Sequence, residues 1–167
     1  MSQKPEIERK YRIAYPDVAA LLALDGARCD EIAQTYLVAP PGVTSRVRCR
    51  TLPDGTRIYT HTVKHRRTLL MNHEDEREIT AEEYAVLLAA RNPALCTVEK
   101  RRITIPYGGL FLEIDLYPFW QRTAILEIEL PSEDTPPPLP PFLTVIDEVT
   151  EDVRYKNERL AAEIPAE

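Results

Sequence analysis

The chain has 167 residues, of which 44% are hydrophobic and 29% are charged. We therefore expect one α+β domain over residues 1–167 and exclude an intrinsically disordered chain. No apolar run approaches the roughly 18 residues that span a bilayer, and the net charge of −6 disfavours a nucleic-acid partner, which usually binds a basic surface. Three cysteines without a C-x-x-C pair, and a start that leads directly into charged residues, favour a cytoplasmic protein with no membrane partner. We expect a monomer or a homodimer, although the sequence does not give the oligomeric state.

Alternation of polar and apolar residues predicts strands through most of the chain. Turn signals, Pro53-Asp54-Gly55 and Gly108-Gly109, separate two of the strand pairs. In chain order, the expected strands are 6–13, 36–38, 44–51, 57–64, 74–79, 98–105, 110–117 and 124–130.

Short helices are predicted between the strands. The segment 17–24 is apolar and short, and 80–90 is the stronger helix because Thr80 and Glu83 have the spacing of a capping box. We expect a last helix over about 154–163.

Residues 135–141 read T-P-P-P-L-P-P and can form neither a helix nor a central strand. Trp120, in Y-P-F-W, is expected in a packing cluster rather than on a base-stacking surface. Many antiparallel strands with a few helices predict one large sheet that closes on itself.

The charges on the predicted strands form same-sign pairs at i, i+2, which share one strand face. The acidic pairs are Glu6/Glu8, Glu76/Glu78 and Glu127/Glu129, joined by Asp115; the basic pairs are Arg46/Arg48 and Lys100/Arg102, joined by Lys10 and Lys64. One explanation is a plain solvated sheet face whose charges keep the strands soluble.

That explanation gives no reason for sorting acids from bases. Two like charges about 4 Å apart repel by about 1 kcal/mol in water and about 4 kcal/mol at an effective dielectric of 20. Inside a closed sheet, a divalent metal would compensate the acids and a polyanion would compensate the bases. The pattern therefore predicts a metal–polyphosphate site on the inner face, with the apolar strand faces turned outward and covered by the helices.

The residues also resemble a known family. Glu6-Ile7-Glu8-Arg9-Lys10 is similar to the N-terminal ExExK signature of the CYTH superfamily, the triphosphate tunnel metalloenzymes, and the order of the later charged pairs is similar too. The segment E-V-T-E-D-V-R-Y-K-N, residues 148–157, resembles the start of the final helix in short bacterial members.

This resemblance implies an eight-stranded antiparallel β-barrel that forms a tunnel, with flanking helices and a C-terminal helix, and hydrolysis of triphosphates with Mg²⁺ or Mn²⁺. It implies that Glu6, Glu8, Glu127 and Glu129 bind metal, and that Glu76, Glu78 and Asp115 help to hold a second metal or the attacking water. Lys100 is a candidate for activating that water. The implied triphosphate clamp is Lys10, Arg46, Arg48, Lys64, Lys100 and Arg102, with Arg154 as an additional candidate where the final helix could cap the tunnel.

Two features depart from the family pattern: Glu74 stands where members often carry Arg, and the loop between Lys64 and Glu76 looks longer than in compact relatives. The leading hypothesis is hydrolysis of inorganic tripolyphosphate. The alternatives are a thiamine triphosphatase, a class IV adenylyl cyclase acting on a nucleoside triphosphate, and a polyphosphate-binding module without turnover.

Overall fold

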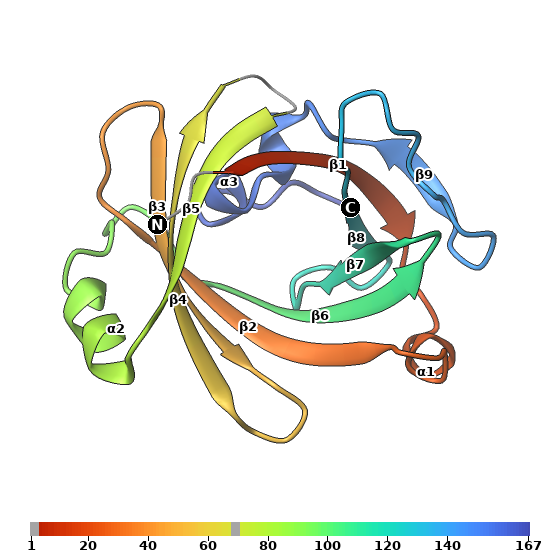
Figure 1. Ribbon diagram of the computed structural model, residues 1–167, viewed down its shortest axis with the longest axis horizontal. Helices are drawn as coiled ribbons and strands as arrows, with labels where there is room; N and C mark the ends of the chain where they lie inside the picture. The colour runs from red at the N-terminus through yellow and green to blue at the C-terminus, as the bar shows by residue number, and fades with distance from the viewer. Residues whose placement is uncertain (1–3, 68–70) are drawn as a thin grey trace.

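Nine antiparallel strands form a single sheet in the computed structural model, which describes residues 4–67 and 71–167 (Figure 1). In chain order the elements are β1 (Lys4–Ala14), α1 (Val18–Leu22), β2 (Arg28–Leu37), β3 (Val43–Thr51), β4 (Arg57–Arg66), β5 (Met71–Ile79), α2 (Ala81–Leu88), β6 (Val98–Tyr107), β7 (Leu110–Leu116), β8 (Thr123–Glu129), β9 (Val145–Glu148), the 3₁₀ helix η1 (Val153–Tyr155) and α3 (Asn157–Leu160).

The sheet curves into a tunnel-like fold (Figure 1). Its strand order is β5-β4-β3-β2-β6-β7-β8-β1-β9. Strand β1 pairs with β8 over Glu8–Ala14. The first part of β1 also pairs with β5, with Lys4 opposite Glu74, and its later part pairs with β9. The two ends of the eight-strand run from β5 to β1 therefore meet along part of their length.

The predicted strands are present, with three differences. β2 has ten residues, whereas alternation predicted only 36–38. Its mixed segment Arg28–Gln34 pairs with β6, and residues from Glu31 onward also pair with β3, whatever the local pattern. β9 was not predicted. The long loop expected between Lys64 and Glu76 is mostly strand, since β4 extends to Arg66 and β5 begins at Met71; residues 68–70 of that loop lie outside the described part.

The capping box of α2 is confirmed: Thr80 Oγ1 accepts from the Glu83 backbone N–H, and the Glu83 carboxylate accepts from the Thr80 N–H, both at 3.1 Å. The expected helix over 154–163 is wrong in extent. Lys156 has φ −74° and ψ 137°, an extended conformation that interrupts the helix, so the segment divides into η1 and the four-residue α3. Within the described residues, no helix is both long and apolar enough to span a bilayer.

The largest hydrophobic cluster lies on the outward face of the sheet, as expected. Fully burying an Ile or Leu side chain contributes about 1.5–3 kcal/mol, so this face provides much of the stability. The prediction was that helices alone would cover this face. In the structure, Leu21 of α1 and Leu143, which lies in the connector between β8 and β9, pack against it together. The buried members are Ile7, Tyr11, Ile13, Leu21, Ile103, Ile105, Leu112, Ile114, Leu116, Ala124, Leu126, Ile128, Leu130 and Leu143.

A second hydrophobic cluster joins the C-terminal segment, the part of the chain after β9 that contains η1 and α3, to the opposite, inward side of the sheet. Tyr155 and Leu160 pack with Tyr36, Tyr117 and Trp120. Trp120 is buried, with its ring centroid 5.4 Å from that of Tyr117, which confirms the expected packing role. The proline-rich segment 136–140 is neither helix nor strand, also as predicted.

Candidate functional site

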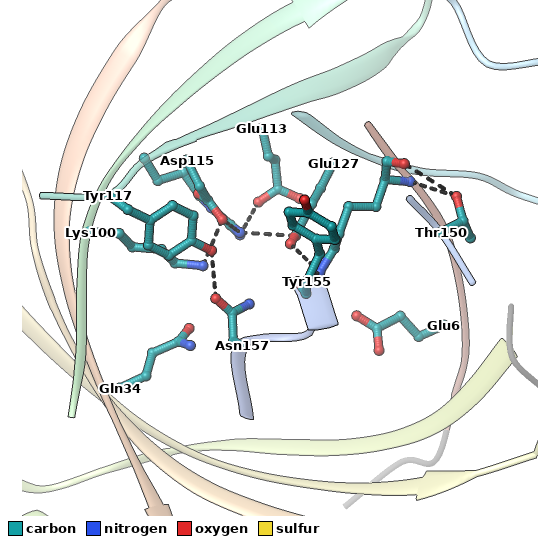
Figure 2. Close-up of polar contacts among 12 residues, drawn as sticks. Glu6, Gln34, Lys100, Glu113, Asp115, Tyr117, Glu127, Thr150, Tyr155 and Asn157 are labelled. Carbon is teal, nitrogen blue, oxygen red and sulfur yellow. Dashed lines mark hydrogen bonds and ion pairs between the residues drawn. The ribbon is translucent and has the colours of Figure 1, made fainter. Parts of the chain in front are cut away.

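The strand register gathers the charged pairs on one side of the sheet, which we call the interior face. Residues opposite one another in an antiparallel ladder share a face, and Lys10 lies opposite Glu127 while Glu8 lies opposite Glu129. Other charged residues that register places on this face are Arg46, Arg48, Lys64, Glu74, Glu76, Glu78, Lys100, Arg102 and Asp115. The side chains converge from several strands of the curved sheet (Figure 2).

Asp115 is the centre of a buried ion-pair network. Its Oδ2 accepts from Lys100 Nζ at 2.7 Å, and Arg102 donates to both carboxylate oxygens, Nε at 2.7 Å and Nη2 at 2.8 Å. Burial opposes ionisation of Asp115, but Arg102 and Lys100 hold its pKa below the ordinary value. Burial lowers the pKa of Lys100 to about 7 in spite of Asp115. A share of Lys100 is therefore neutral near pH 7 and able to accept a proton.

Glu127 connects this network to β1. Its Oε2 accepts from Arg102 Nη2 at 3.0 Å, and its Oε1 lies 3.2 Å from Lys10 Nζ. Although Glu127 is buried, Lys10 and Arg102 hold its pKa well below the ordinary value. Lys10 Nζ also donates to the backbone carbonyl of Tyr155 at 3.1 Å, so this lysine joins the interior face to the C-terminal segment.

A second group of charges surrounds Lys64. Its Nζ lies 2.9 Å from Glu6 Oε2 and 3.7 Å from Glu74 Oε2. Burial raises the pKa of Glu74 to about 7, and the nearby Glu6 acts in the same direction. Burial, with Glu127 and Glu6, likewise raises the pKa of Glu8 to about 7. Two interior acids thus hold protons part of the time near neutral pH, so added positive charge would favour their ionised forms.

Three predicted acids lie in a more solvent-accessible part of the interior face. Glu76, Glu78 and Glu129 are exposed, and Glu76 Oε1 accepts from Thr62 Oγ1 at 2.8 Å. They share the face with the buried network by register and are accessible to water.

A cavity of about 440 Å³ opens on this face. Predicted residues from three strands line it: Glu8 and Lys10 of β1, Arg46 of β3 and Lys64 of β4. Lys156, from the C-terminal segment, lines it too. The cavity is therefore bordered by one acid and three bases of the predicted site.

The C-terminal segment lies against the interior face, where Asn157 Oδ1 accepts from Tyr117 Oη at 2.6 Å (Figure 2). Glu158 Oε2 accepts from Thr44 Oγ1 at 2.8 Å. Arg154 has a different position from the one expected. It is exposed, pairs with Asp152 at 2.7 Å, and is not among the described residues that line the cavity.

Sequence reasoning missed several interior residues. Asp30 and Gln34 of β2 are fully buried, and Glu113 pairs with Arg102. The alternation of Asp30, Ile32, Gln34 and Tyr36 could have indicated a strand face, but mixed polar and apolar residues there obscured it.

No family model matches the chain. The chain is 34% identical over 164 residues to the inorganic triphosphatase of Nitrosomonas europaea, an alignment that covers 96% of this chain and 99% of that protein. The chain belongs to the inorganic triphosphatases of the CYTH superfamily.

A solved structure agrees with this family. The crystal structure of the inorganic triphosphatase NE1496 has a TM-score of 0.56 at 31% identity, covering 96% of this chain and all of that one. HpAC1 from Hippeastrum, described as a putative adenylyl cyclase with a dominant triphosphatase activity, has a TM-score of 0.56 at 20% identity, covering 76% of this chain and 80% of that one. At this identity the second likeness shows the fold alone.

Proposed function

We propose that the chain hydrolyses the terminal phosphoanhydride of a linear triphosphate, with inorganic tripolyphosphate as the leading substrate. The observation that carries the proposal is the convergence of buried carboxylates and buried cations on one interior face beside a cavity. The 34% identity to an inorganic triphosphatase over almost the entire chain supports the substrate class.

The proposal includes a closed eight-stranded barrel around this interior. Its support is the pairing of β5 with the first residues of β1, at the two ends of the eight-strand run. Closure would exclude bulk water from the ion pairs and so strengthen their interactions with a bound polyanion.

The interior carboxylates have the donor chemistry for Mg²⁺ or Mn²⁺, which prefer carboxylate oxygens. Glu6 Oε2 and Glu127 Oε1 are buried and accept no hydrogen bond, although each lies at ion-pair distance from a lysine. Among the described residues, no three acidic, His or Cys side chains are gathered as a preformed metal site. The acids would therefore exchange their lysine and arginine partners for the ion when it binds.

We assign Glu6, Glu8, Glu127, Glu129 and Asp115 as the residues that would hold the metal. When bound, the ion would polarise phosphoryl oxygens and neutralise the charge that develops on them.

The remaining roles belong to the cations and to the accessible acids. Lys10, Arg46, Arg48, Lys64 and Arg102 would bind phosphoryl oxygens and hold the chain in line for displacement. Arginine suits this role because its planar group donates two parallel hydrogen bonds.

Lys100, which lies beside Asp115 and is partly neutral near pH 7, would accept the proton of the attacking water, and Glu76 and Glu78 would orient that water. The water oxygen bonds to the terminal phosphorus and the bridging P–O bond breaks, giving orthophosphate and pyrophosphate. This is general base catalysis, which typically contributes about 10²–10⁴-fold.

The test is a substrate panel of tripolyphosphate, thiamine triphosphate and ATP, each with Mg²⁺, Mn²⁺ or EDTA. We expect phosphate release from tripolyphosphate with a divalent ion and none with EDTA. Preference for thiamine triphosphate, or formation of cyclic AMP from ATP, would reassign the substrate. Tight calorimetric binding of tripolyphosphate without phosphate release would instead indicate a binding module.

A further inference from the structure

Two interior arginines of β3, Arg48 and Arg50, have partners of different charge on β2. Arg50 is held by a carboxylate: its Nε and Nη2 each lie 2.6 Å from Asp30 Oδ2. Arg48 is held by a neutral amide: its Nε and Nη2 lie 2.9 and 2.6 Å from Gln34 Oε1. The positive charge of Arg50 is therefore compensated by its hydrogen-bond partner, whereas Gln34 brings no negative charge to Arg48.

Gln34 is well placed to orient a side chain. It is fully buried, and its amide points into the ring of strands (Figure 2). The β2–β3 register places it directly opposite Arg48, and its Nε2 contacts Tyr36 Oη at 3.4 Å. An amide that is fixed at both ends holds the guanidinium in one orientation.

The surroundings of Arg48 make an uncharged partner significant. Burial, with Arg46 and Arg102 nearby, lowers the pKa of Arg48 to about 10, although Glu76 and Asp115 act in the opposite direction. The guanidinium therefore remains protonated at neutral pH, while the side chain that is hydrogen-bonded to it is neutral. Its Nη1, with two further N–H donors, is not engaged by Gln34. A cation of this kind favours binding of an anion.

We propose that Gln34 is a positioning residue for Arg48, and that its uncharged amide holds the guanidinium toward a bound triphosphate without cancelling its charge. This inference rests on the proposed function, because it specifies how one clamp residue is kept available for phosphate. Gln34 acts through Arg48 and does not touch the reacting atoms.

Two substitutions of Gln34 separate charge from orientation. Gln34→Glu retains the size and an acceptor oxygen but neutralises Arg48, so we expect KM for tripolyphosphate to rise by about ten-fold or more while kcat changes less. Gln34→Met removes the acceptor and leaves the charge, so a smaller rise in KM is expected. Gln121→Glu, a matched change at an exposed position, should leave both constants unchanged.

A double-mutant cycle with Arg48→Ala identifies the residue through which Gln34 acts. In the Arg48→Ala background, Gln34→Glu should change KM by less than about two-fold, because no guanidinium remains to be neutralised. An equal effect in both backgrounds, or a larger loss with Gln34→Met than with Gln34→Glu, would overturn the proposal. Thermal unfolding of each variant identifies any that fails to fold. If Gln34→Glu fails to fold, the double-mutant cycle is measured with Gln34→Met instead.

Calorimetric titration of tripolyphosphate into the EDTA-treated protein makes the two proposals distinguishable. If the wild-type protein binds tripolyphosphate but releases no phosphate, hydrolysis is wrong, and weaker binding by Gln34→Glu still supports the role of Gln34. If the wild-type protein hydrolyses tripolyphosphate and Gln34→Glu has the same KM and affinity, the role of Gln34 is wrong and the proposed function stands.

Discussion

Glu127→Gln is the most informative single substitution, because Glu127 joins two buried cations. Its carboxylate lies 3.2 Å from Lys10 Nζ and 3.0 Å from Arg102 Nη2. Removing one partner of a buried ion pair costs about 3–5 kcal/mol, and the amide retains one acceptor oxygen, so we expect a loss of about 3 kcal/mol. For a domain of this size, the melting temperature should fall by about 6–12 °C.

The stability difference should depend on pH in a defined direction. The cations hold the pKa of Glu127 well below its ordinary value of 4.5, so its contribution is fully present above about pH 4.5 and is lost as the pH falls through the lowered folded-state value. The difference in unfolding free energy between wild type and Glu127→Gln should therefore be full at pH 7 and shrink below about pH 4.5. Urea denaturation in EDTA over this range measures it without a metal contribution.

The same variant tests the assignment of metal ligands. If Glu127 holds the ion, turnover of tripolyphosphate should fall by about 10²–10³-fold, comparable to the loss of one group that stabilises transition-state charge, and calorimetric Mg²⁺ affinity should fall as well. The control is Glu99→Gln, which removes an exposed charge from β6. Unchanged turnover and Mg²⁺ affinity in a folded Glu127→Gln protein would refute the metal role, and an unchanged melting temperature would refute the ion-pair reasoning.

Four further predictions are simpler. Lys100→Arg keeps the positive charge but cannot become neutral at working pH, so kcat for tripolyphosphate should fall by about 100-fold with KM within a few-fold; an equal kcat would exclude Lys100 as the proton acceptor. Arg154→Ala should leave KM within about two-fold, because Arg154 pairs with Asp152 outside the cavity; a ten-fold rise would restore the role expected from the sequence. Thr80→Ala should lower the unfolding free energy by about 1 kcal/mol through loss of the α2 cap with kcat unchanged, as urea denaturation and the phosphate assay would show. Removal of divalent ions with EDTA should abolish phosphate release and added Mg²⁺ or Mn²⁺ should restore it; activity that persists in EDTA would contradict the metal requirement.

The interior face shows how far alternation alone could predict the site. Same-sign pairs such as Glu6/Glu8 and Arg46/Arg48 have a spacing of two residues, which in a strand fixes them on one face whatever the strand pairs with. The register confirms that those faces coincide. The partners of individual charges were not predictable in this way, because they are distant in sequence. Lys64, for example, donates a hydrogen bond to Glu6, which lies 58 residues earlier in the chain.

The C-terminal segment was the least predictable part. Residues 154–163 have a composition that suits a helix, yet Lys156 adopts an extended conformation between η1 and α3. Asn157 accepts a hydrogen bond from Tyr117 on the interior face, so its position depends on tertiary packing rather than on helix propensity. Arg154 is exposed and pairs with Asp152, two residues before it.

The sequence by itself determined the strand alternation, the sorting of acids and bases onto strand faces, the α2 capping box and the family, because each is encoded by residues close in the chain or by their order along it. Only the tertiary structure decided which acid meets which base, that Gln34 rather than a carboxylate holds Arg48, and that Glu8, Glu74 and Lys100 have pKa values of about 7. The physical reason is that burial and long-range pairing set these charge interactions, and both exist only once strands distant in sequence lie side by side.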